Sequence, residues 1–119
     1  MGILGVNHVA FRTTDPQRLR DFYSTLLGAE TIEGAHDPLR VGSTLLVFFE
    51  ATGAVGQDEI AFDADARGFD EALRRAREMR LEVRGPVEHT AWSKGFYVAD
   101  PDGRRVEVTF DDRSVFWRE

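Results

Sequence analysis

The chain's 119 residues, 42% of them hydrophobic, suffice for one domain with a continuous core, and no apolar run reaches the roughly 18 residues of a membrane span. The net charge of -6, with arginines interleaved among acids, argues against a nucleic-acid surface, and the N-terminus does not read as a signal peptide. The absence of cysteine excludes thiolate chemistry, so a metal would need imidazole, carboxylate or amide ligands. We expect a cytoplasmic protein whose partners are small molecules or other proteins, without nucleic acid or membrane.

The first half of the chain predicts a strand, a helix and three shorter strands. Thr14 and Asp15 supply a cap for the helix, and Pro16 suits its first turn. Apolar residues recur at helical spacing from Leu19 to Leu27, and Gly28 is placed to end the helix. The expected elements are a strand at 6–11, a helix beginning at 16, and strands at 30–32, 39–41 and 44–50.

The second half repeats this order. Asp65 can cap a helix whose apolar stripe runs from Phe69 to Met79. The segment DPDG at 100–103 has proline and glycine where a tight turn requires them. The expected elements are strands at 60–62 and 81–83, this helix between them, and a hairpin over 96–110.

The two halves overlay as an internal duplication. The segment VNHVAF at 6–11 falls on QDEIAF at 57–62, so that His8 and Glu59 occupy equivalent places. We therefore expect a single α+β domain over residues 1–119, built from two tandem βαβββ modules of roughly 1–54 and 55–119.

Alternation along the strands predicts which side chains avoid the helices. Because the bulky face of each first strand must pack on a helix, His8 and Glu59 point to the other face, each followed two places on by a small alanine. Glu107 alternates with valines and should leave the helix side as well. The strand at 44–49 is apolar on both faces, so the polar residues would lie beside an apolar wall, as in a small-ligand site. The alternative is an ordinary solvated sheet face.

These segments resemble the vicinal oxygen chelate superfamily, which includes glyoxalase I, the bleomycin-resistance and fosfomycin-resistance proteins, and extradiol dioxygenases. The segment NHVAFRTTDPQRLRDFYSTLLG is similar to the strand and helix of a first module, and FYVADPDGRRVEVTF to the closing hairpin of a second. The resemblance implies paired βαβββ modules whose mixed sheets curl around a cavity, often within a homodimer.

The resemblance also implies a divalent metal held by His8, Glu59 and Glu107. Glu59 stands where a second histidine is usual, and a carboxylate can replace that ligand. Such a donor set, with open positions for water or substrate, suits Mn, Fe, Co, Ni or Zn. Aligning Gly42 with Gly103 places Leu46 opposite Glu107, so the fourth ligand of glyoxalase I has no counterpart.

Five further residues are candidates for the site. Tyr97 matches a tyrosine that contacts substrate in the fosfomycin-resistance proteins, and Phe48 and Trp92 are candidates for the substrate wall. Glu50, at a strand end, and His89, in the polar segment EHTAWSKG, are candidate catalytic bases. The alternatives are core packing for the aromatic residues and a solvated position for Glu50 and His89.

Two functions of different classes follow from the resemblance. The first is a metal-dependent lyase, isomerase or dioxygenase-like enzyme that acts on a small oxygen-chelating substrate. The second is a metal-free binding protein of the bleomycin-resistance type, which sequesters a drug in a groove between two subunits. A third possibility is a duplicated scaffold that has lost both roles.

Overall fold

The computed structural model describes residues 2, 6, 8–34, 36–53, 56, 58–90 and 93–111, and only the backbone of residues 89, 90, 93 and 111. Within these residues the order of strand, helix and three strands occurs twice, which confirms the predicted tandem modules. The elements are β1 (His8–Thr13), α1 (Pro16–Leu27), β2 (Glu30–Thr31), β3 (Leu39–Val41), β4 (Thr44–Glu50), β5 (Glu59–Ala64), α2 (Ala66–Glu78), β6 (Arg84–Thr90), β7 (Ser93–Ala99) and β8 (Arg105–Asp111).

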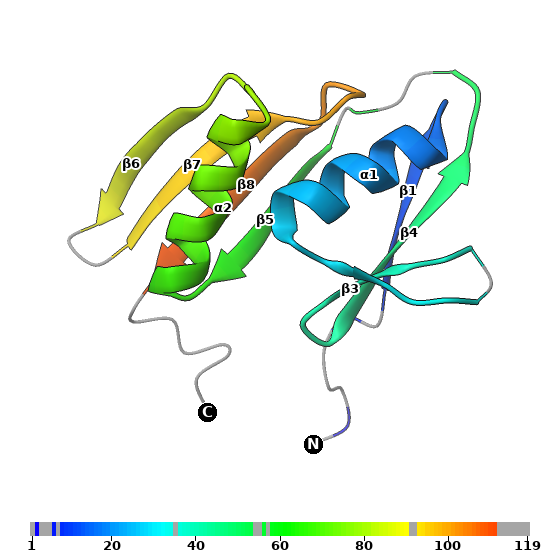
Figure 1. Cartoon of the computed structure of the whole chain (residues 1–119), viewed down its shortest axis with the longest axis horizontal. Helices are drawn as coiled ribbons and strands as arrows, with labels where there is room; N and C mark the ends of the chain where they lie inside the picture. The colour runs from blue at the N-terminus through cyan, green and yellow to red at the C-terminus, as the bar shows by residue number, and fades with distance from the viewer. Residues whose placement is uncertain are drawn as a thin grey trace.

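Each module forms its own four-stranded mixed sheet, with strand orders β1-β4-β3-β2 and β5-β8-β7-β6. The first and last strands of each module pair in parallel, and the remaining pairs are antiparallel. Both helices cover the same side of the two sheets, which lie next to one another (Figure 1). A thickness of 24 Å fits one layer of helices on one layer of strands. Neither α1 nor α2, the two helices of the described residues, covers the other side of the sheets.

The helix α1 forms where local signals and burial agree. The Asp15 carboxylate accepts a hydrogen bond from the backbone N–H of Arg18 at 3.1 Å, Pro16 occupies the first turn, and Gly28 ends the helix with φ of 63°. Its buried face carries Leu19, Phe22, Tyr23 and Leu26. Burying each large side chain contributes about 1.5–3 kcal/mol, so packing rather than propensity stabilises this helix.

The helix α2 follows the same plan and packs against α1. Asp65 caps it by accepting from the backbone N–H of Gly68 at 2.7 Å. Its buried residues join those of α1 and both sheets in one hydrophobic cluster. Neither helix of the described chain is long and apolar enough to cross a membrane.

The predicted strand at 81–83 is wrong, because the outer strand of the second sheet begins at Arg84. The segment EHTAWSKG, predicted to be a loop, contributes instead to both β6 and β7 among its described residues. A strand containing Gly85 and Pro86 contradicts propensity. It is tolerated because β6 is an edge strand with irregular pairing to β7, so the missing proline N–H costs no ladder bond on its free side.

The predicted equivalence of Leu46 with Glu107 is also wrong. Val41 pairs with Thr44 across a two-residue turn, whereas Ala99 pairs with Arg105 across the longer turn at 100–104. Because the turns differ in length, aligning their glycines displaces the following strands. The parallel registers pair Ala10 with Val47 and Ala61 with Glu107, so Val47 is the counterpart of Glu107.

A buried polar network joins α1 to the turn before β8. The hydroxyl of Tyr23 donates to Asp100 Oδ2 at 2.7 Å, and Arg104 Nη1 donates to the same oxygen at 2.6 Å. Asp100 Oδ1 accepts from the backbone N–H groups of Asp102 and Arg104, both at 2.9 Å. Arg104 Nε also forms an ion pair with Asp58 Oδ1 at 3.0 Å. The DPDG segment is thus a structural anchor between modules as well as a turn.

We expect the stability of the protein to fall at alkaline pH through Tyr23. Burial and the negative charge of Asp100 raise the pKa of Tyr23. Below about pH 10 the phenol is protonated in both the folded and unfolded chains. Above it the unfolded chain loses the proton first, so the free energy of unfolding falls by up to about 1.4 kcal/mol per pH unit.

Urea denaturation at several pH values between about 9 and 11 measures this decline. Tyr23→Phe should cost roughly 1 kcal/mol at neutral pH, because Asp100 keeps Arg104, and should flatten the alkaline decline. An equally steep decline in the variant would contradict the assignment to Tyr23.

Candidate functional site

The candidate site lies on the side of the two sheets opposite the helices, here called the open face. On β1 the exposed residues include His8 and Ala10, while Phe11 is buried toward the helices. On β5 the exposed Glu59 and Ala61 alternate with half-buried residues that pack on the core. The predicted directions of His8 and Glu59 are confirmed, because alternation along a strand decides them.

The apolar part of the open face comes from β4. Leu45 and Val47 pair with His8 and Ala10 and therefore share their side of the sheet. Phe48 does not belong to this wall. It pairs with Phe11, stacks on that ring at a centroid distance of 5.4 Å, and is 3% exposed, so it packs in the core beneath the helix.

Of the two predicted bases, Glu50 lies away from the open face, and the side chain of His89 is not among those that the structure describes. Glu50 is exposed at the end of β4 and has the same alternation as Phe48, so its side chain belongs to the helix side of that strand. His89 lies in β6 rather than in a loop, and its side chain is outside the described residues. Trp92 is outside them altogether.

A chain of contacts crosses the open face of the second sheet. Arg105 Nε lies 3.0 Å from Glu59 Oε1, and the Arg105 guanidinium lies over the Tyr97 ring at 4.2 Å from its centroid. Tyr97 pairs with Glu107 across β7 and β8, so the two side chains share this face. Desolvation of the phenol and its hydrogen bond to Glu107 raise the pKa of Tyr97, which stays protonated at neutral pH.

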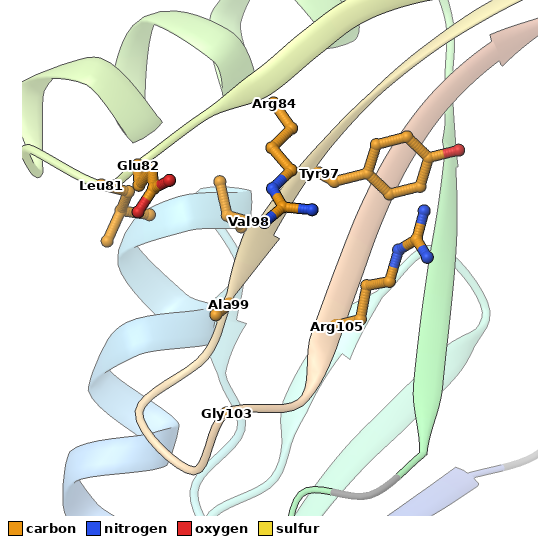
Figure 2. Close-up of a pocket in the computed structure, with 8 residues that line it drawn as sticks. All are labelled: Leu81, Glu82, Arg84, Tyr97, Val98, Ala99, Gly103 and Arg105. Atoms are coloured by element: carbon orange, nitrogen blue, oxygen red, sulfur yellow. The ribbon is translucent and has the colours of Figure 1, made fainter.

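A cavity of about 240 Å³ opens beside this network (Figure 2). Figure 2 shows Arg84, Tyr97 and Arg105 projecting into the same space from neighbouring strands. The volume suits a small ligand or one part of a larger one. The full lining comprises Leu81, Glu82, Arg84, Tyr97, Val98, Ala99, Gly103 and Arg105.

The three predicted metal ligands are not brought together by one chain. Across the described residues, no group of three or more His, Cys, Asp or Glu side chains could hold a metal ion. Glu59 and Glu107 lie on adjacent strands of the second sheet, whereas His8 lies on the first sheet. The donor types suit a divalent metal, but one chain supplies an incomplete set.

The family model described as "Glyoxalase/Bleomycin resistance protein/Dioxygenase superfamily" matches residues 5–108. The chain belongs to this superfamily. This membership confirms the predicted resemblance and fold class, and it accounts for the two tandem modules. It leaves the reaction open, because a fold of this kind supports several chemistries.

Relatives of this glyoxalase-superfamily chain include the "Metallothiol transferase FosB" of Staphylococcus epidermidis, which is 23% identical over 99% of this chain and 92% of that protein. The "Biphenyl-2,3-diol 1,2-dioxygenase 2" of Rhodococcus globerulus is 26% identical over 91% of this chain, which spans 63% of the dioxygenase. The solved structure of "Oxidase ChaP-H2" superimposes with a TM-score of 0.82 at 23% identity, covering 92% and 94% of the two chains, and shows the same fold.

Sequence reasoning missed the two arginines of the cavity. A signal for Arg105 was present, because it precedes Glu107 by two places on one strand and must share its face. No comparable signal existed for Arg84. Its position depends on β6, which the glycine and proline at 85 and 86 concealed.

Proposed function

We propose that this member of the superfamily acts as a homodimer and catalyses a divalent-metal-dependent reaction of lyase, isomerase or dioxygenase type on a small oxygen-chelating substrate. The observation that carries the proposal is the pair of carboxylates, Glu59 and Glu107, on neighbouring strands of an uncovered sheet face. The names of the relatives, a metallothiol transferase and a dioxygenase, support a reaction of this general kind.

In the proposed dimer a second copy of the chain covers the open face and supplies the imidazole that one copy lacks. His8 of one copy would join Glu59 and Glu107 of the other. A bound divalent metal would supply Lewis-acid stabilisation of negative charge that develops on the substrate oxygens. A homodimer with twofold symmetry would contain two such sites, because each copy contributes both halves.

The residues of the chain itself have separate roles in this proposal. Tyr97 stays protonated and orients the Glu107 carboxylate by its hydrogen bond. Arg105 balances the charge of Glu59 through the contact between its Nε and Glu59 Oε1. The apolar side chains of Leu45 and Val47 exclude water from one side of the site.

A second candidate is a metal-free small-molecule binding protein in which two subunits enclose the ligand. The Glu59–Arg105 contact at 3.0 Å favours it, because a guanidinium already balances the charge of one predicted ligand. In this case the open face would still be covered by a second copy, and the cavity at Tyr97 would hold the ligand.

Metal analysis of protein purified without chelators tests the first candidate. We expect near-stoichiometric divalent metal in the wild type and a loss of most of it in His8→Ala, whereas His36→Ala should keep it. His36 is a suitable control because it is exposed and packs on Phe49 at 4.8 Å. Wild-type protein that is dimeric and metal-free under these conditions would favour the second candidate.

Mixing two variants tests whether the site is shared. His8→Ala and Glu107→Ala copies should each lose metal alone, but a mixed dimer regains one intact site. After unfolding and refolding an equal mixture, about a quarter of the wild-type metal content should return. No recovery in a mixture that forms mixed dimers would contradict a site built from two copies.

A further inference from the structure

The cavity beside β6 and β7 is lined by two guanidinium groups, and the proposed function gives a role only to that of Arg105. Arg84 and Tyr97 are paired in register, so the arginine projects from the edge strand on the same face as the phenol. Arg105 reaches this face from β8 and lies over the Tyr97 ring. The arginines thus flank one aromatic side chain from its two neighbouring strands (Figure 2).

Arg84 is the cation that remains available to a ligand. No ion pair joins it to another residue in the described part of the chain. Glu82 also lines the cavity but is not within ion-pair distance of Arg84. An arginine at the edge of a concave site that forms no ion pair with the described residues favours a ligand that carries negative charge.

Arg105 is held in a way that leaves part of its guanidinium usable. Its Nε faces Glu59, and the stacking on Tyr97 fixes the plane of the group. A guanidinium has five N–H donors in a rigid fork, so the contact with Glu59 and the hydrogen bond with Tyr97 still leave N–H donors for a ligand. Stacking also lowers the entropy lost when a planar anion binds.

The rest of the lining is suited to an apolar body. Leu81, Val98 and Ala99 supply the apolar part of the lining, and Ala99 lies on the same side of β7 as Tyr97. Apolar lining with few convergent polar groups is typical of sites for small organic molecules. A planar carboxylate suits a place between two guanidinium groups, because each fork can pair with its oxygens, whereas a neutral amide lacks the negative charge.

We propose that this cavity binds the carboxylate of a small organic acid between Arg84 and Arg105, with the apolar body of the ligand on Leu81 and Ala99. The inference rests on the proposed function in one respect, since it assigns the substrate class of that site. The binding itself requires no metal, which allows the two proposals to be tested separately.

Titration of metal-free protein with benzoate, followed by NMR shifts of backbone amides, tests the inference. We expect millimolar binding, as for a fragment, with the largest shifts at Ala99 and Gly103 beside the cavity. Benzamide, the neutral isostere, should bind at least about tenfold more weakly. Equal binding of both probes, or benzoate shifts confined to other parts of the chain, would overturn the proposal.

The decisive variant is Arg84→Gln, at an exposed position of an edge strand where folding should be unaffected. It should weaken benzoate binding about tenfold, and Arg84→Lys should recover part of the loss by restoring the charge without the fork. Arg67→Gln removes an arginine whose side chain is 89% exposed on α2 and should change nothing. Wild-type affinity in Arg84→Gln would refute the site.

His8→Ala separates this inference from the proposed function. If the variant loses metal but still binds benzoate through Arg84, both proposals stand. If His8→Ala has no effect on metal content while Arg84→Gln still abolishes benzoate binding, the metal proposal fails and the carboxylate site stands. If benzoate does not bind the wild type although metal binding depends on His8, the reverse holds.

Discussion

Replacing Asp100 by alanine is expected to lower the free energy of unfolding by about 3–5 kcal/mol, because it leaves the Arg104 charge buried without its main partner. The side chains of Arg104 and Asp100 are 3% and 0% exposed, and their atoms are 2.6 Å apart. The same change removes the acceptor for the Tyr23 hydroxyl, which α1 holds in the core. Urea denaturation followed by far-UV circular dichroism measures the loss.

Asp70→Ala provides the matched control for charge. Asp70 is exposed on α2, so the same substitution should change stability by less than about 0.5 kcal/mol. If Asp100→Ala does not fold, Arg104→Met provides a second test, since Asp100 then keeps its donors from the turn backbone and Tyr23. A loss of less than about 1 kcal/mol in Asp100→Ala would contradict an anchoring role.

Phe48→Ala is expected to lower the free energy of unfolding by about 3–5 kcal/mol, because it opens a cavity within the aromatic cluster of the first module. The Phe48 ring stacks on Phe11 at 5.4 Å and on Tyr23 at 5.9 Å. A residue of the ligand wall would behave differently, since its removal would weaken ligand binding with little loss of stability. Thermal and urea unfolding distinguish the two roles.

The neighbouring Phe49 provides a matched control for Phe48→Ala. It is half-buried on the opposite side of β4, and Phe49→Ala should cost roughly 1 kcal/mol. The two phenylalanine variants should therefore differ in stability, because the two side chains lie on opposite faces of β4. Equal losses at the two positions would contradict the assignment of Phe48 to the core.

Most of the fold was predictable because its signals are local. The cap at Asp15, the apolar spacing of α1 and the turn at 100–103 each depend on residues close in the chain. The open-face direction of His8 and Glu59 followed from alternation alone. The strand β6 was not predictable, since its glycine and proline contradict strand propensity and only pairing with β7 stabilises it.

The candidate site was predictable residue by residue but not as an assembly. The sequence identified Glu107 and Tyr97, and cross-strand pairing brings them to one face. It could not reveal that Arg105 contacts Glu59, because that contact depends on the parallel register of β5 and β8. Nor could it indicate that Arg84 lies beside Tyr97, since the pairing of β6 sets that neighbour.

By itself the sequence determined the duplicated α+β modules, their helices, and the face that each strand residue takes, since periodicity and capping act over a few residues. The tertiary structure decided which strands pair, in what register, and how the sheets lie beside one another. Those choices depend on turn length and on the packing of α1 against α2, which involve residues far apart in the chain. The sequence pattern therefore places all three predicted ligands on the side away from the helices. In one folded chain, however, His8 lies on a different sheet from Glu59 and Glu107.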